Sequence, residues 1–255
     1  MPIDTLLETL ITELDDDNTI AFGLTGSYAR GDATPHSDVD LWQFVKTMPD
    51  DPYAKYTLRQ VQDHLVSLSI RTLAHEADKL KQPDSALAAV PGLRQMRVLR
   101  DKTGELGALL QAAHDFKWDT LQSAANDYAS HELAGQAEEA HKIMTGLQQA
   151  EDTLMLYWLM GLLFGLTHAV AVHKGLIIDS ENHYFRNVQL AVGDQSAWTH
   201  HHRAALGLLM ASPSMRAHAG LRLYRDTVAL LEPVILPGHV PVIQATLQRM
   251  VHFVG

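Results

Sequence analysis

The stretch Gly26–Trp42, GSYARGDATPHSDVDLW, decides the fold of the first part of the chain. Directly before it, residues 19–25 (TIAFGLT) are β-prone, and Gly26 interrupts this predicted strand. At its end begins the segment 39–45 (VDLWQFV), whose side chains alternate in the manner of a second strand. The stretch therefore joins two predicted strands through a glycine-containing turn.

The turn that begins at Gly26 has the features of an anion-binding site. Small residues let backbone N–H groups approach an anion closely, and the hydroxyl of Ser27 adds a further donor. Arg30 follows one helical turn later, where a guanidinium group can bind a phosphate in forked geometry. We predict that Gly26, Ser27 and Arg30 bind phosphate.

Asp38 and Asp40 are predicted to share one face of the second strand, about 7 Å apart along it. Two neighbouring carboxylates repel each other unless a cation lies beside them. Mg²⁺ prefers oxygen ligands and can also bind nucleotide phosphates, so the pair predicts a magnesium site. The alternative without function has Asp38 capping a loop and Asp40 solvated on an edge strand, where carboxylates are uncommon.

Gly26-Ser27, about ten intervening residues and then Asp38-x-Asp40 resemble the signature of the DNA polymerase β-like nucleotidyltransferase superfamily, especially its minimal and antibiotic nucleotidyltransferase branches. The motif covers residues 20–45 of this chain. The resemblance implies transfer of a nucleoside monophosphate from an NTP, expected to be ATP, to an acceptor hydroxyl, with release of pyrophosphate. It implies that Asp38 and Asp40 are catalytic and hold Mg²⁺, and that Gly26 and Ser27 hold the β- and γ-phosphates.

One feature of the family is missing from the sequence. Members commonly have a third carboxylate on a later strand, and the corresponding segment here, residues 65–73 (LVSLSIRTL), contains no acid. Its candidate positions hold Ser67, Ser69 and Arg71. The nearest acids, Asp63 and Glu76, are poorly placed by strand register. Either two carboxylates suffice, or the activity is weakened or lost.

A general base would then come from the helical part of the chain. Glu138 and Lys142 lie four residues apart on a helix predicted over residues 132–172, so they share one face. We predict Glu138 as a catalytic base and Lys142 as a nucleotide-binding residue, with Glu132 and Glu139 on an alternative face. A salt-bridged surface pair is the competing interpretation of Glu138 and Lys142.

The hydrophobic pattern predicts an α+β fold in two parts. A small mixed-sheet nucleotidyltransferase domain is predicted over residues 1–104, and an all-helical bundle domain over residues 105–255. In the first part the predicted helices cover residues 4–14, 53–63 and 74–90, the last of them interrupted at Pro83, and a last strand covers residues 96–101. In the second part the predicted helices cover residues 106–114, 118–128, 132–172, 197–210, 215–231 and 240–254.

Composition and charge limit the partners. The 255 residues carry a net charge of −10, which argues against a nucleic-acid partner held through its phosphates. There is no cysteine, which excludes disulfides and thiolate zinc sites and is typical of the cytoplasm. Residues 154–172 are nearly long enough to span a membrane, but Thr167 and His168 interrupt them and no basic cluster flanks them, so a buried helix is predicted.

We therefore expect a cytoplasmic enzyme, without a membrane or nucleic-acid partner, that nucleotidylates a hydroxyl of a small acceptor such as an aminoglycoside-like molecule. A homodimer is the expected assembly. Two alternatives remain open. The acceptor can be a protein side chain, as in antitoxin-type minimal nucleotidyltransferases, although the added helical domain is unusual for these. The chain can also be a catalytically silent nucleotide-binding protein, which the missing third acid favours.

Overall fold

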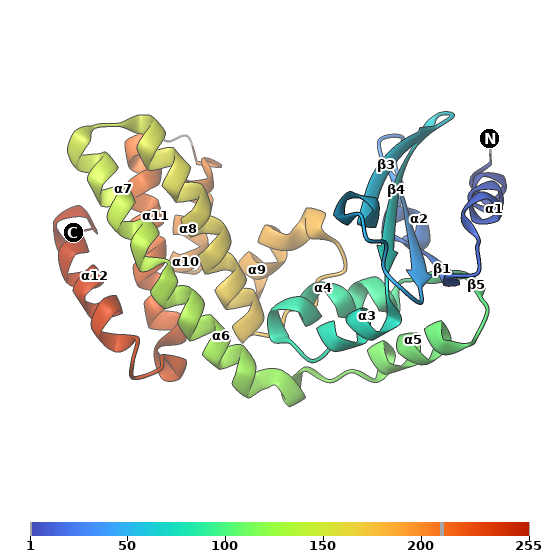
Figure 1. Cartoon of the computed structure of the whole chain (residues 1–255). Coiled ribbons are helices and arrows are strands. Elements are labelled where there is room, and N and C mark those ends of the chain that lie inside the picture. The colour runs from blue at the N-terminus through green and yellow to red at the C-terminus, as the bar shows by residue number, and fades with distance from the viewer. Residues whose placement is uncertain (1, 210–211, 255) are drawn as a thin grey trace. The chain divides into compact units, whose positions relative to one another are not determined.

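The computed structural model describes residues 2–209 and 212–254. It divides into two compact units, Met1–Lys117 and Trp118–Gly255 (Figure 1). The first unit holds a five-stranded mixed sheet and the second is helical, which confirms the α+β fold. The units divide after Lys117, whereas the sequence predicts a boundary at residue 104. The difference arises because the helix at residues 105–115 packs on the core of the first unit.

The sheet has the strand order β3-β4-β2-β1-β5. Its strands are β1 (Thr19–Thr25), β2 (Val39–Val45), β3 (Tyr56–Val61), β4 (His64–Arg71) and β5 (Arg97–Asp101). Strands β2 and β4 are parallel, and every other neighbouring pair is antiparallel. The two strands that flank the decisive turn have the predicted bounds, 19–25 and 39–45.

The helix predicted over residues 53–63 is wrong. This segment forms the short 3₁₀ helix η1 (Pro52–Lys55) and then β3, which pairs with β4 along its whole length. Val61 pairs with His64 across a two-residue turn in which Gln62 has a φ of 53°. Pairing with a neighbouring strand therefore decides the conformation of a segment whose own pattern is ambiguous.

Helices cover both faces of the sheet (Figure 1). On one face, α1 (Ile3–Leu14) buries Leu6, Leu7, Leu10 and Ile11 against apolar side chains of β1, β2 and β4. On the other face lie α3 (Leu73–Lys79), α4 (Pro83–Arg94) and α5 (Glu105–Asp115), whose core residues include Leu93, Leu106 and Leu109. The interruption predicted at Pro83 within residues 74–90 is confirmed, because α3 ends at Lys79 and α4 begins at Pro83.

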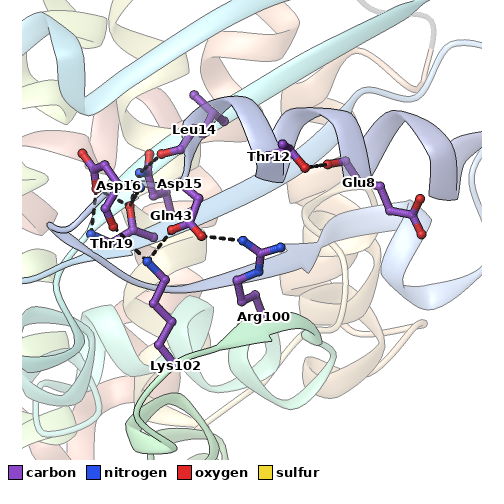
Figure 2. A network of polar contacts seen from close by, with 9 residues as sticks. All are labelled: Glu8, Thr12, Leu14, Asp15, Asp16, Thr19, Gln43, Arg100 and Lys102. Atoms are coloured by element: carbon purple, nitrogen blue, oxygen red, sulfur yellow. Dashed lines mark hydrogen bonds and ion pairs between the residues drawn. The ribbon is translucent and has the colours of Figure 1, made fainter.

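A polar network fixes the start of β1 (Figure 2). Asp16 accepts hydrogen bonds from the backbone N–H and the hydroxyl of Thr19, at 2.8 and 2.6 Å. Gln43 of β2 donates to the same hydroxyl at 2.8 Å and to the backbone oxygen of Leu14 at 3.1 Å. Asp15 pairs with Arg100 and Lys102, and the hydrogen bond from Lys102 lowers the pKa of the Asp15 carboxyl. The network therefore ties α1, β1, β2 and β5 together.

The helices of the second unit are α6 (Gln122–Gly135), α7 (Ala137–Gln149), α8 (Asp152–His173), α9 (Tyr184–Val192), α10 (Ala197–Leu206), α11 (Pro213–Leu231) and α12 (Val240–Val254). Three short 3₁₀ helices connect them, η2 (Trp118–Leu121), η3 (Glu181–His183) and η4 (Glu232–Val234). The single helix predicted over residues 132–172 is wrong, because α6 ends at Gly135 and the chain turns again at Ala150, which has a φ of 51°. The helix predicted over residues 197–210 ends earlier, at Leu206, and its predicted last residue, Met210, lies outside the described residues.

Helix α8 is, among the described residues, the one helix long and apolar enough to cross a membrane by length and composition. More than half of its apolar stretch is buried inside the protein. Its Thr167 hydroxyl lies 2.9 Å from Nε2 of His202, which is also fully buried, so α8 makes polar as well as apolar contacts within the unit. We interpret α8 as the core helix of the second unit.

Candidate active site

The carboxylate of Asp40 lies directly against Gly26. Strand β1 ends at Thr25, and the short helix α2 (Gly26–Arg30) begins at once, with a φ of +68° at Gly26. A Cβ atom on Gly26 would lie 2.1 Å from Oδ2 of Asp40, which is far inside van der Waals contact. Only glycine fits this position, both because of its backbone conformation and because of the neighbouring carboxylate.

Strand register places Asp40 in the middle of the sheet. Asp40 pairs with Thr25 of β1 on one side and with Ser67 of β4 on the other. Asp38 lies just before β2, which begins at Val39, and it is half-buried. The structure thus brings Gly26 and Asp40 together. Asp38 lies outside the strand, so the prediction that both carboxylates lie on the strand and share one of its faces holds only for Asp40.

Arg30 is held by hydrogen bonds within the first unit. Its Nε donates to Oδ2 of Asp32 at 3.2 Å, and its Nη1 donates to Oε1 of Gln95 at 3.3 Å. The helix that carries it ends at Gly31, whose φ of +83° is the left-handed conformation common at helix ends. The phosphate-binding role of Arg30 stays a prediction, and its guanidinium group is already oriented by two neighbours.

The residue opposite Asp40 on β4 is Ser67, so no acid of β4 shares the row of Asp40. Asp63 lies in the turn before β4. Glu76 lies on α3 with its carboxylate buried, and accepts hydrogen bonds from Arg71 and Lys79, both at 2.7 Å. Neither Asp63 nor Glu76 therefore lies on β4, where the family commonly has its third carboxylate. This agrees with the prediction from strand register.

The carboxylates of Asp38 and Asp40 fit a magnesium ion whose other ligands are waters and the phosphates of a bound nucleotide. Asp38 and Asp40 supply hard oxygen donors, and the carboxylate of Asp40 occupies the space that a side chain on Gly26 would fill, so it lies directly beside the turn. Within residues 2–209 and 212–254, no group of three or more acidic or histidine side chains is arranged to hold a metal. Proteins commonly bind Mg²⁺ through one or two carboxylates, with waters and substrate phosphates completing the octahedron.

Glu138 and Lys142 belong to α7 in the second unit and bind each other. Lys142 Nζ lies 2.5 Å from Oε1 of Glu138 and 3.5 Å from the ring centroid of Trp158. This hydrogen bond lowers the pKa of the Glu138 carboxyl, which makes it a weaker base near neutral pH. On the alternative face, Glu132 accepts a hydrogen bond from Gln136 at 2.7 Å. The catalytic role of Glu138 and the nucleotide-binding role of Lys142 stay predictions.

Sequence reasoning missed Gln95, and although it placed Arg71 at a candidate position of the later strand, it missed the contact of Arg71 with Trp42. Gln95 follows the end of α4 and reaches Arg30, but no local pattern marks a glutamine so distant in the chain. Arg71 lies 3.7 Å from the ring centroid of Trp42, the next residue after Asp40 on the same face of β2. Their strand positions indicated proximity, but the stacking depends on Glu76, which holds the guanidinium group.

Comparisons with known proteins agree with the fold of the first unit. Residues 7–89 match the family model described as "Nucleotidyltransferase domain". A solved structure of a nucleotidyltransferase-like protein from Exiguobacterium sibiricum 255-15 is similar, with a TM-score of 0.56 and 14% sequence identity over 91% of this chain and 77% of that chain. At this identity the likeness shows the fold. The comparison with curated proteins finds no match.

Proposed function

Because residues 7–89 belong to the nucleotidyltransferase domain family, we propose that the chain transfers a nucleoside monophosphate from ATP to a hydroxyl of a small acceptor, releasing pyrophosphate. The observation that carries this proposal is the contact between Asp40 and Gly26. It puts a carboxylate beside the turn whose backbone N–H groups are proposed to hold the triphosphate. An aminoglycoside-like acceptor suits the net charge of −10.

In the proposed reaction, the acceptor oxygen forms a bond to the α-phosphorus and the bond from that phosphorus to pyrophosphate breaks. The hydroxyl proton leaves to a base. Asp38 and Asp40 would hold Mg²⁺, which when bound would neutralise charge on the α-phosphate and the leaving group. Gly26 and Ser27 bind the β- and γ-phosphates, and Arg30 adds a cation at the end of the same short helix. Catalysis then consists mainly of positioning and electrostatic stabilisation.

Glu138 is the proposed base and Lys142 a proposed phosphate contact. Both roles require the pair to separate, because each side chain now satisfies the other. We further propose a cytoplasmic homodimer that uses neither nucleic acid nor a membrane as partner. The net charge of −10 supports the absence of a nucleic-acid partner.

The test is magnesium-dependent release of pyrophosphate, measured with each of the common NTPs against kanamycin, streptomycin and sucrose. We expect release with ATP and at least one of these acceptors. Asp38→Asn and Asp40→Asn should each lower the rate by about 10³-fold while the melting temperature stays within a few degrees, because a metal supplies several kcal/mol of transition-state stabilisation. Full activity in both variants would refute the metal assignment.

A second candidate function is a catalytically silent nucleotide-binding protein. Ser67 favours it, because this serine stands in the row of Asp40 on the strand where the family commonly has its third acid. Binding of Mg²⁺ and ATP without pyrophosphate release, with every acceptor in the panel, would support this candidate. A protein acceptor is the other alternative, and a radiolabelled ATP donor would detect it by label on a polypeptide.

A further inference from the structure

We infer, on the basis of the proposed function, that Gln95 is a positioning residue that holds Arg30 toward the phosphates of the bound NTP. Gln95 follows the last residue of α4, and its Oε1 accepts a hydrogen bond of 3.3 Å from Nη1 of Arg30. The two residues are 65 positions apart in the sequence, so this contact joins the end of α4 to the short helix α2. Gln95 acts on nucleotide binding only through Arg30.

Helix α2 turns Arg30 toward the face of the sheet that carries Asp40. Tyr28 and Ala29 of α2 pack instead on the core under α1, which lies on the opposite face. Arg30 is four residues after Gly26, whose backbone lies against the Asp40 carboxylate, and residues four apart in a helix lie on the same side of it. The backbone of Arg30 is therefore only about 6 Å along the helix axis from the proposed phosphate-binding turn.

The end of α4 packs on the same face of the sheet. Phe44, four residues after Asp40 on β2 and so on the same face, shares a buried core with Met96, the residue that follows Gln95. Met96 lies directly on β1, because a Cβ atom added at Gly23 would be 2.3 Å from its Sδ. Since β1 leads without a break into α2, this packing places Gln95 beside α2.

Asp32 makes the second contact that fixes the guanidinium group. Its Oδ2 accepts from Nε of Arg30 and its Oδ1 lies beside Nη2, both at 3.2 Å, which is the forked geometry of an arginine–carboxylate pair. The backbone N–H groups of Gly31 and Asp32 both donate to the carbonyl oxygen of Ser27, at 2.9 and 3.1 Å, so the chain after α2 folds back on the helix. Asp32 and Gln95 together engage all three nitrogens of the guanidinium group and so define its plane.

A glutamine suits this position because its amide is a neutral acceptor. A guanidinium group carries only donors, so the amide of Gln95 turns its oxygen toward Arg30. That oxygen accepts a hydrogen bond without adding a full negative charge beside the place proposed for the triphosphate. The Asp32 side chain does carry such a charge, but it is 56% exposed and therefore screened by water.

Fixing Arg30 in advance strengthens its binding to a phosphate. An arginine side chain that rotates freely loses conformational entropy when it is immobilised by a ligand, and this loss weakens binding. Gln95 and Asp32 have already restricted the rotation of Arg30 before the nucleotide arrives. The Arg30 side chain is still 20% exposed, so part of it is accessible to a ligand.

A double-mutant cycle tests this inference, because a residue that acts only through Arg30 has no effect once Arg30 is removed. The affinity for a nonhydrolysable ATP analogue with Mg²⁺ is measured by isothermal titration calorimetry for wild-type protein, Gln95→Ala, Arg30→Ala and the double variant. Gln82→Ala is the matched control. Gln82 is exposed at the other end of the same helix, and its side chain makes no capping hydrogen bond.

We expect Gln95→Ala to weaken binding of the analogue about 3- to 10-fold, as the loss of one preorganised side chain does, and Gln82→Ala to leave it within about twofold. Arg30→Ala should weaken binding about 10- to 100-fold, because it removes hydrogen bonds to a charged ligand. Adding Gln95→Ala to Arg30→Ala should change the affinity by less than about twofold.

The inference would be overturned if Gln95→Ala weakened binding equally with and without Arg30, because Gln95 would then act through the packing of α4. Unchanged affinity in either single variant would overturn it as well. In both cases the proposed function stands, provided that wild-type protein binds the analogue and releases pyrophosphate from ATP in the presence of an acceptor. If wild-type protein binds the analogue but releases no pyrophosphate, the cycle still decides the role of Gln95 and the proposed function alone fails. If it binds no nucleotide, both are wrong.

Discussion

At the scale of single residues, the site depends on the close approach of the Asp40 carboxylate to Gly26, which has no side chain. Gly26→Ala would force a Cβ atom toward Oδ2 of Asp40 and place alanine at a φ of +68°, a conformation that costs about 1–2 kcal/mol. We predict that this variant binds Mg²⁺ and ATP at least about tenfold more weakly, measured by isothermal titration calorimetry.

Gly31→Ala is the matched control for Gly26→Ala. Gly31 has a similar φ of +83°, but a Cβ atom there would meet nothing within 4 Å. The control carries the backbone strain without the collision with Asp40, so it should lose a similar amount of stability and retain nucleotide binding. Equal loss of binding in both variants would mean that strain in α2, and not the contact with Asp40, controls the site.

Glu138 provides a second prediction at this scale. Its carboxylate is paired with Lys142, and this pairing lowers its pKa. Because Glu138 is the proposed base, we predict that Glu138→Gln lowers the rate of pyrophosphate release by about 10²-fold and leaves the KM for ATP unchanged. A change of less than about threefold would exclude Glu138 as the base, as its lowered pKa would then explain.

These residues also show what the sequence could reveal. The spacing of Gly26, Ser27, Asp38 and Asp40 predicted the turn and the strand that carries Asp40, because glycine and strand alternation act locally. The partner of Arg30 could not be predicted, since Gln95 comes close only after α4 has packed on the sheet. Long-range side-chain partners depend on tertiary packing, which no local pattern encodes.

At the scale of elements, β3 likewise shows that local sequence does not encode tertiary partners. Its residues were predicted as helix, and they became an edge strand because β4 offers a complete set of backbone partners. The misassignment concealed the row of Asp40, Ser67 and Leu58, because this pairing exists only in the strand conformation. A segment without strong periodicity takes the structure of its neighbours.

The connection between β4 and α3 yields a stability prediction. Glu76 is buried and accepts from both Arg71 and Lys79, whose side chains are a quarter exposed. Glu76→Gln leaves two cations without their anion, so we predict a loss of about 2–3 kcal/mol in the free energy of unfolding, measured in urea. Asp78→Asn, which breaks an exposed pair with Lys81 just beyond the end of the same helix, should change the free energy of unfolding far less than Glu76→Gln does. Equal effects would show that burial of Glu76 is energetically unimportant.

At the scale of the whole molecule, the two units should differ in their response to acid. His202 of the second unit is fully buried, stacks on Trp198 and contacts Thr167 and Gln189 through its two ring nitrogens, at 2.9 Å each. Burial lowers the pKa of its imidazole from 6.5 to about 4. The folded unit therefore binds this proton more weakly than the unfolded chain does.

The sign of the pH effect follows from this difference. The contribution of His202 to the free energy of unfolding of the second unit is present above pH 6.5 and is lost as the pH falls toward 4. At pH 4 this loss reaches about 3 kcal/mol. We predict that calorimetric unfolding at pH 5 shows a loss of about 2 kcal/mol relative to pH 7, assigned to His202 by comparison with His202→Gln. The same pH dependence in wild-type protein and in this variant would exclude His202 as the cause.

The central claim is that Asp38 and Asp40, beside the Gly26-Ser27 turn, bind a divalent ion together with a nucleoside triphosphate. The most direct measurement is binding of Mn²⁺, detected by electron paramagnetic resonance, in the presence of a nonhydrolysable ATP analogue. We predict that wild-type protein and the control Asp63→Asn, altered in the turn before β4, bind the ion alike, whereas Asp38→Asn and Asp40→Asn bind it at least about tenfold more weakly. Unchanged Mn²⁺ affinity in both of these variants would contradict the account.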